Sequence, residues 1–440
     1  MKKVDLLKDD IKPLVHRYMI PSVFGMVALS TCIFFDTMFI GKGIGDNGLA
    51  ALNICLPIYS IFNAISYLIA VGGATTLSIA LGRKEAEKAN GIFSLSLVLI
   101  GVLSLIFTIL GLLFLEEVCI TIGASHSILS LTKDYMGIIL LGTPLFMFAS
   151  TLGVFLRNDK VPKLTMAAVI TGNLVNIILD YIFVITLGFG MKGAAFATVI
   201  AQICAIFIMS IHFLRRKNSI KLSFESLKLK ETFKILKNGS SNFLMDISAA
   251  FVIYAFNIML FSIKGDMGVA VYGIINNIML IGLAVISGIA QSVQPIWSIN
   301  YGARNLKRVR ESLNIALKIS LITGIIFLIV GFAIPDTLAR IFTNDNGELL
   351  NLTVNGIRIS FIAFLFVGCN MVSMFYFQSV ESTKSSSIIS IMRGFVLLVA
   401  FIIILPKIFG INGVWITIPL TEALIFAISY FLFKKSSVLE

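Results

Sequence analysis

Apolar stretches long enough to cross a lipid bilayer recur along the whole chain and constrain its fold more than any other feature. Most have about 20–28 residues, so each would span the ~30 Å of membrane hydrocarbon as a helix. We therefore predict an all-α polytopic membrane protein with twelve transmembrane helices. The predicted spans are residues 14–40, 48–81, 91–115, 135–156, 164–187, 190–214, 238–263, 268–301, 311–335, 357–378, 385–406 and 411–433.

The balance of residue types agrees with a lipid environment. Of the 440 residues, 58% are hydrophobic and only 13% are charged. A soluble domain carries roughly 25% charged residues, so this chain has too few to cover a water-facing surface. The five cysteines are scattered singly and the three histidines are dispersed. We interpret the cysteines as small apolar packing residues and expect no metal site.

The net charge of +12 follows a pattern along the chain. If the N-terminus is cytoplasmic, 26 Lys and Arg residues fall on the cytoplasmic side of the predicted spans and six on the other side. An excess of positive charge in short cytoplasmic loops orients membrane proteins. We therefore predict a multi-pass protein of the cell (inner, cytoplasmic) membrane with both termini in the cytoplasm. The basic charge then reflects topology and gives no reason to expect a nucleic-acid partner.

The chain also contains an internal repeat. The basic segment 215–237 divides it into an N-terminal six-helix lobe, 1–214, and a C-terminal six-helix lobe, 238–440. Residues 45–82 align without gaps on residues 265–302, with 13 identities in 38 positions. Because each half has an even number of spans, we predict two lobes related by a pseudo-two-fold axis along the membrane normal. Two such lobes would enclose a cleft that opens to either side in turn.

Five stretches occur in the order and spacing of one transporter family. They are Asp36-Thr37-Met38-Phe39-Ile40-Gly41, GGATTLSIALGRKEAEKA (72–89), Asn176-Ile-Ile-Leu-Asp180, GMKGAAFATVIAQ (190–202) and Gln294-Pro295-Ile296 with Asn300-Tyr301-Gly302-Ala303. Together they resemble the multidrug and toxic compound extrusion (MATE) family of bacterial type. The resemblance implies a two-lobed antiporter that expels amphipathic, often cationic compounds in exchange for Na⁺ or H⁺. Two residues depart from the family pattern. Glu381 stands where the family usually has a small residue, and Asp246 stands where many relatives have Glu, Gln or Ser.

Acidic residues inside spans are candidates for function, because a charge at the bilayer centre costs roughly 2.5–3.5 kcal/mol. Asp36 and Asp180 have similar predicted depths in the outer half of the N-terminal lobe, and Asn176 shares a helix face with Asp180. Thr198 descends to a comparable depth. Such a pair either shares a proton or binds a hard cation such as Na⁺ through oxygen ligands. In the resembled family the matching residues couple the ion. The alternative is that both acids are structural.

Other polar residues within spans suggest a substrate path and a hinge. Asp246 either binds cationic substrate or faces an aqueous vestibule, and Gln291 and Gln294 face either the cleft or a neighbouring helix. Pro21 removes a backbone hydrogen bond fifteen residues before Asp36, so it is a hinge candidate. One further pair, Arg393 and Glu422, is expected to form an intramembrane ion pair with a structural role.

Three other functions are considered. A lipid-linked oligosaccharide flippase of the same fold would need a cationic cleft, but the only cations within spans that were not counted with either side of the membrane are Lys318, Arg358 and Arg393. A major-facilitator transporter normally carries an Asp that the loop from Gly82 to Glu85 lacks. A membrane enzyme would need a nucleophile–base pair or a metal spacing, and none is found. We therefore expect no enzyme, no ATP site and no cofactor beyond the coupling cation, with membrane lipid and amphipathic or cationic drugs and dyes as partners.

Overall fold

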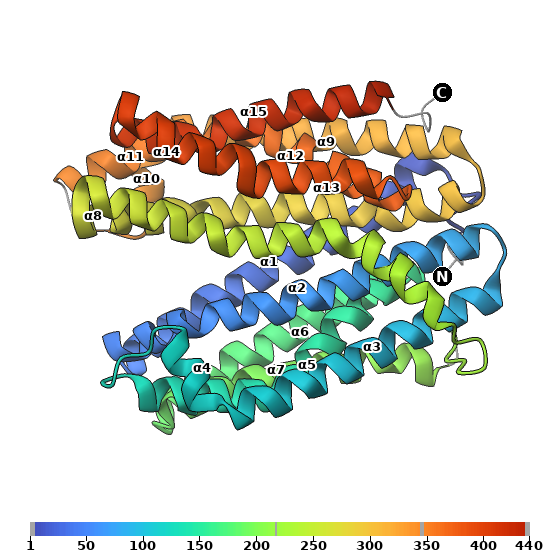
Figure 1. Ribbon diagram of the computed structural model, residues 1–440, viewed down its shortest axis with the longest axis horizontal. Helices are drawn as coiled ribbons and strands as arrows, with labels where there is room; N and C mark the ends of the chain where they lie inside the picture. Colours follow the sequence, from blue (N-terminus) through green and yellow to red (C-terminus); the bar gives the residue numbers. More distant parts are fainter. Residues whose placement is uncertain (1–4, 216–217, 344–346, 436–440) are drawn as a thin grey trace. The chain divides into compact units, whose positions relative to one another are not determined.

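The computed structural model describes residues 5–215, 218–343 and 347–435, and these residues form helices and connecting turns without a β-strand. Figure 1 shows the helices as long rods. The elements are α1 (Ile11–Gly43), α2 (Asp46–Gly82), α3 (Ala86–Leu113), α4 (Leu115–Thr121), α5 (Leu129–Asn158), α6 (Pro162–Asp180), η1 (Tyr181–Thr186), α7 (Gly190–Leu214), η2 (Leu229–Glu231), α8 (Thr232–Gly302), α9 (Leu306–Ala333), α10 (Pro335–Arg340), α11 (Glu348–Phe361), α12 (Phe364–Ser379), α13 (Thr383–Ile391), η3 (Met392–Val396), α14 (Leu397–Phe409) and α15 (Ile411–Lys435).

The apolar helices account for the predicted spans, with two differences in detail. Among the described residues, ten helices are long and apolar enough to cross a membrane, or eleven if the bent pair α11 and α12 counts as one span. This pair bends by 46°, and the predicted span 357–378 covers the end of α11 and all but the last residue of α12. In addition, α8 has 71 residues and contains two predicted spans, 238–263 and 268–301.

A glycine separates the two segments of α8. Gly265 has φ 58° and ψ −146°, a backbone conformation outside the helical region that only glycine adopts readily. Its repeat counterpart, Gly45, has φ 88° directly before α2. Gly190 and Gly410 likewise both have φ 59°. Left-handed turn residues therefore recur at the same offset of 220 residues that relates the two halves of the sequence.

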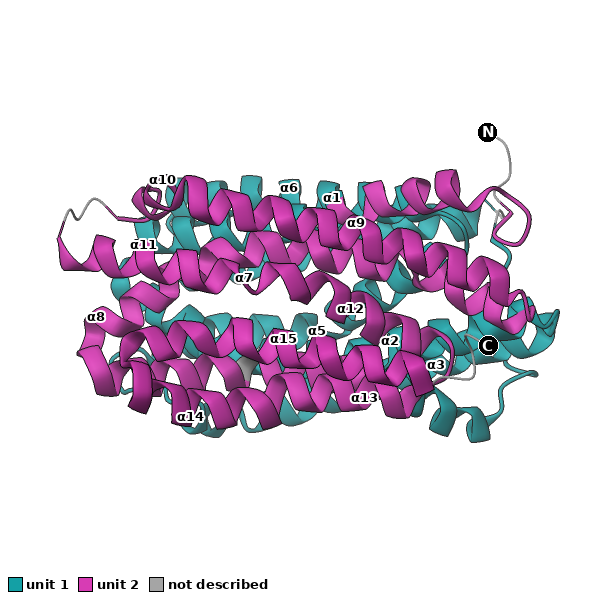
Figure 2. Ribbon diagram, turned by 90° about the horizontal axis from the view of Figure 1, so that it is seen from above, with its two compact units in different colours: residues 1–4, 24–239 teal, residues 5–23, 240–440 magenta. Residues whose placement is uncertain are grey.

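The helices form two compact units (Figure 2). Unit 1 contains residues 24–239, and unit 2 contains residues 5–23 together with the described residues from Ser240 onward. The division differs from the predicted lobes at two places. Residues 5–23, which include the first part of α1, cluster with unit 2. The basic segment 215–237 clusters with unit 1 as far as it is described.

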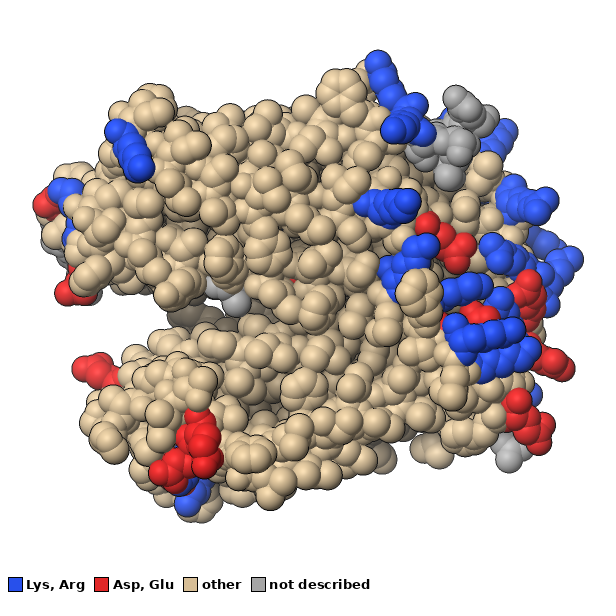
Figure 3. Space-filling view, in the orientation of Figure 1, with Lys and Arg blue, Asp and Glu red and all other residues tan. Residues whose placement is uncertain are grey.

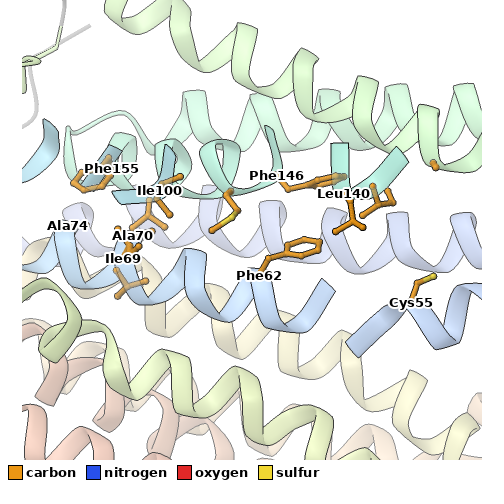
Figure 4. Close-up of a cluster of buried hydrophobic side chains, with 14 of the residues drawn as sticks. Cys55, Phe62, Ile69, Ala70, Ala74, Ile100, Leu140, Phe146 and Phe155 are labelled. Carbon is orange, nitrogen blue, oxygen red and sulfur yellow. The ribbon is translucent and has the colours of Figure 1, made fainter. Parts of the chain in front are cut away.

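Unit 1 is organised around α5, which contacts α2, α3 and α7. Figure 4 shows part of its buried cluster, with Cys55 and Phe62 of α2 near Leu140 and Phe146 of α5. In lipid, helices associate through van der Waals packing and small residues, because lipid tails are as apolar as the side chains. In unit 2 the corresponding contacts join α12 to α9, α13 and α15.

The segment after α7 is bonded to the end of unit 1. Asp159, which is 4% exposed, accepts hydrogen bonds from His212 Nε2 at 2.7 Å and from the backbone N–H of Ser219 at 3.0 Å. The N–H of Lys221 donates to Asn90 Oδ1 at 2.8 Å. These bonds hold the connection between the two units against unit 1. Figure 3 shows that most of the Lys and Arg side chains visible on this face gather toward the right of the view, with a few at the left.

Candidate functional site

Two carboxyl groups from different helices meet inside unit 1. Asp180 is the last residue of α6 and none of its surface is exposed. Asp36 lies on α1, half-buried, with its Oδ1 atom inaccessible to solvent. The two side chains are close enough to interact directly with each other. The structure therefore brings together the two acids that the sequence placed at similar depth.

Within the described part of the chain, this carboxyl pair has no partner to balance its charge. Asp36 Oδ1 and both carboxyl oxygens of Asp180 are buried without a hydrogen-bond donor among the described residues. In the part of the chain that the structure describes, no Lys or Arg acts on either carboxyl group. Two negative charges so close together in an apolar unit repel each other strongly. A proton shared between them, or a bound cation, is what such a pair can hold.

Asn176 and Thr198 form a hydrogen-bonded chain beside the pair. Asn176 lies one turn before Asp180 on α6 and is 3% exposed. Its Nδ2 donates to Thr198 Oγ1 of α7 at 3.3 Å, and the Thr198 hydroxyl donates to the carbonyl of Ala194 at 2.9 Å. The Asn176 Oδ1 atom lies 2.8 Å from Cys32 Sγ of α1, which donates to it. All four predicted site residues thus lie in one region of unit 1.

Local helix geometry positions these groups. A Cβ atom on Gly172 of α6 would lie 3.1 Å from the carbonyl oxygen of Ala201, so glycine lets α6 approach α7 closely enough for Asn176 to reach Thr198. After Asp180 the chain continues as η1, a π-helix. Single π-helical turns inside α-helices are rare and occur often at functional sites, because the wider turn changes the direction of the side chains.

The sequence interpretation missed three residues of this region. Cys32, assigned to packing, is one turn before Asp36 on the same face of α1 and bonds Asn176. Tyr59 of α2 has a buried hydroxyl, and its ring centroid is 6.5 Å from that of Tyr135 on α5. Both tyrosines are close enough to Asp36 to interact with its charge. Their polar atoms inside otherwise aliphatic spans are the signal that would have identified them.

The predicted substrate residues lie in unit 2, on two segments of α8. Asp246 lies before the Gly265 break, is half-buried and has an Oδ2 atom buried without a hydrogen-bond partner among the described residues. Gln291 and Gln294 lie after the break and are 8% and 2% exposed. Asp246 is therefore only partly buried, whereas the two glutamines are buried in the second segment of α8.

The predicted ion pair of unit 2 is confirmed. Arg393 Nε of the π-helix η3 donates to Glu422 Oε1 of α15 at 2.5 Å. Asn370 of α12, which the sequence interpretation missed, donates from Nδ2 to Glu422 Oε2 at 2.7 Å and to the Glu422 carbonyl at 2.8 Å. Three helical segments therefore converge on one carboxylate, which is 3% exposed.

Pro21 lies inside α1, which remains continuous from Ile11 to Gly43. The boundary between the two compact units falls two residues later, between Val23 and Phe24. The hinge candidate thus lies where α1 passes from unit 2 into unit 1. Among the described residues, no group of three or more His, Cys, Asp or Glu side chains has the spacing of a metal site.

Known proteins resemble the chain over nearly its full length. Multidrug export protein MepA of Staphylococcus aureus is 25% identical over 424 residues, which cover 94% of this chain and 91% of MepA. The solved outward-facing structure of a multidrug resistance MATE family transporter of the MOP superfamily is 24% identical, with a TM-score of 0.93 and coverage of 99% and 98%. A MOP superfamily transporter from Pyrococcus furiosus, 24% identical, has a TM-score of 0.92 and coverage of 100% and 99%.

The family model described as MatE matches the chain twice, over residues 21–182 and 243–404. The two matches fall on the two halves of the internal repeat, and together they cover more than half of the chain. The fold is that of the solved MATE transporters. The chain therefore belongs to the MatE family.

Proposed function

We propose that this protein is a secondary active multidrug efflux transporter that antiports amphipathic, mainly cationic compounds against Na⁺ or H⁺ by alternating access. The observation that carries the proposal is the buried contact between Asp36 and Asp180, two acids without a balancing cation among the described residues. The name of its relative MepA, a multidrug export protein, supports the same function.

The coupling ion would act through the charge of this pair. With a proton or Na⁺ bound, the two carboxyl groups lie together; after release their repulsion favours separation of α1 from α6. Asp36 lies in the part of α1 that belongs to unit 1, while the part before Pro21 belongs to unit 2. A movement of α1 at Asp36 would therefore be transmitted across Pro21 to the other unit. Asn176 and Thr198 would serve as neutral ligands or as supports of the pair.

We propose that polar residues of unit 2, together with flexible apolar side chains, recognise the substrate. Asp246 has the charge to attract a cationic drug or dye, and its Oδ2 atom has no partner within the described part of the chain. Gln291 and Gln294 are the further candidates. We propose a location in the cell membrane with both termini cytoplasmic. Transport would draw on an ion gradient, with neither ATP nor a nucleic-acid partner and no enzymatic step.

The flippase alternative is less favoured by the structure. It requires free cations to bind a pyrophosphate, and one of the three cations within spans, Arg393, is paired with Glu422. If the flippase function were correct, deletion in the source organism would cause lipid-linked precursors to accumulate, and drug tolerance would be unchanged in a host that expresses the protein.

Dye transport into everted membrane vesicles tests the proposed function. Everted vesicles from a pump-deficient host should accumulate ethidium when a Na⁺ gradient or a pH gradient is imposed, each applied separately. Replacement of the partly exposed Asp134 by Asn serves as the matched control and should leave transport unchanged, since Asp134, on α5, lies 3.4 Å from the exposed Lys192 and away from the carboxyl pair. Accumulation that needs ATP, or none under either gradient with confirmed membrane expression, would contradict the proposal.

A further inference from the structure

The oxygen atoms of the unit 1 site are not equally available to a cation. A hard cation such as Na⁺ needs several oxygen ligands at once. Asn176 Oδ1 accepts from Cys32 Sγ at 2.8 Å, and Thr198 Oγ1 accepts from Asn176 Nδ2 at 3.3 Å. Each of these two neutral oxygens thus already accepts one hydrogen bond within the protein. The atoms of the pair left without a donor among the described residues are Asp36 Oδ1 and both carboxyl oxygens of Asp180.

We infer that Cys32 determines which cation this site prefers: by holding the Asn176 amide oxygen, its thiol favours a proton over Na⁺. The inference rests on the proposed coupling role of the Asp36–Asp180 pair and adds a residue to it. Cys32 is a positioning residue, since it acts through the orientation of Asn176. The thiol is 9% exposed and lies one helical turn from Asp36.

A proton and Na⁺ need different numbers of oxygen ligands, and the site offers enough free oxygens for the proton only. A proton needs only two facing oxygens, and the carboxyl pair supplies them. Na⁺ would need the amide oxygen in addition, and the Cys32 hydrogen bond competes for that oxygen. The titratable groups near the pair are Cys32 on α1, Tyr59 on α2 and Tyr135 on α5. Each is neutral when protonated, so none supplies the positive charge that would replace a bound ion.

Variants at position 32 test the inference directly. Cys32→Val keeps a side chain of similar size and removes the donor, and Cys32→Ser keeps a donor. The purified full-length protein is melted over a range of pH and of NaCl, with choline chloride keeping the ionic strength constant. We expect the valine variant to reach half of its maximal Na⁺ stabilisation at a concentration about two- to tenfold lower than wild type, because one competing hydrogen bond is lost.

The serine variant should follow the wild-type Na⁺ curve. Cys55→Ala is the matched control: it removes another buried thiol of unit 1, in the apolar cluster of Figure 4, and should leave the Na⁺ curve unchanged although it lowers the melting temperature. Cys32→Ala provides a second donor-free variant if the valine does not fold. The pH dependence of melting should persist in all of them.

The possible results separate this inference from the proposed function. Equal Na⁺ curves for wild type and the donor-free variants, with a cation response that Asp180→Asn lacks, would overturn the role of Cys32 alone. A melting temperature that responds to neither pH nor Na⁺, in wild type and in Asp180→Asn alike, would instead contradict the ion site itself. A Na⁺ response of the serine variant equal to that of the valine variant would show that side-chain volume, not hydrogen bonding, sets the preference.

Discussion

Arg393 and Glu422 illustrate how single charged residues are accommodated inside a helical unit. The carboxylate of Glu422 receives donors from Arg393 and Asn370, so its charge is balanced and its lone pairs are occupied. The Asp36–Asp180 pair is the opposite case, because three of its four carboxyl oxygens are buried without donors among the described residues. A satisfied charge stabilises a fixed arrangement, whereas an unsatisfied pair changes its energy with every proton or cation it gains or loses.

The Arg393–Glu422 pair allows a prediction about stability. Arg393→Met alone leaves a buried carboxylate without its cation and should destabilise the protein by about 3–5 kcal/mol. The double variant Arg393→Met/Glu422→Met removes both charges and should recover most of this loss. The apparent melting temperatures of wild type and the variants in detergent give the order of their stabilities. A double variant that melts below Arg393→Met would show that the pair stabilises beyond charge balance.

For single residues, the sequence predicted the charged side chains of the site but not the neighbouring side chains that contact the site from other helices. Helical spacing places Asn176 on the face of Asp180, and loop-to-residue distances place Asp36 at a similar depth. Neither argument says which helix lies beside which. Cys32 was therefore assigned to packing, although its partner Asn176 lies 144 positions away in the chain. Tyr59 was missed for the same reason.

Individual elements depart from straight helices where the backbone requires it. The second segment of α8 begins after Gly265, and the α11–α12 pair bends by 46°. The repeat showed Gly265 to match Gly45, so the break was foreseeable from the sequence. The bend was not, because no proline or glycine marks residues 361–364 and an apolar run does not show the direction of its axis.

The break in α8 gives the second prediction. Gly265→Ala should destabilise the protein by about 1–3 kcal/mol, because its backbone conformation is strained for a residue with a side chain. Gly273→Ala is the matched control in the same helix; it too has open space for a Cβ atom, but its conformation is helical. It should be neutral or slightly stabilising. Equal melting temperatures for the two variants would show that Gly265 is not held in this conformation in the membrane.

At the scale of the whole molecule, the family match repeats over the two halves of the chain, but the two compact units do not follow chain order throughout, because residues 5–23 cluster with unit 2. The start of the chain is bonded to unit 2: Asn300 Nδ2 donates to the carbonyl of Leu6 at 3.0 Å, and Arg308 Nη2 donates to that of Asp9 at 2.6 Å. The segment after α7 is bonded to unit 1. Sequence identified the repeat, but it placed residues 5–23 in the N-terminal lobe because chain order does not reveal such a departure.

Orientation in the membrane is the third prediction. The excess of Lys and Arg in the loops predicted to be cytoplasmic places His126 outside the cell and Glu225 inside. In a variant with the native cysteines replaced, a membrane-impermeant thiol reagent should label His126→Cys in intact cells and Glu225→Cys only after permeabilisation. Labelling at position 225 but not at position 126 in intact cells would contradict this orientation and indicate the opposite one.

The most direct test of the coupling site is gradient-driven dye transport by Asp36→Asn, Asp180→Asn and the double variant, with Asp134→Asn as control. Asn keeps the shape of Asp and removes its charge. Each single variant should lose transport while remaining folded and inserted, and the double variant should be no worse, since the two acids act as a unit. Near-normal transport by Asp180→Asn would contradict the account and would show that Asp180 is structural.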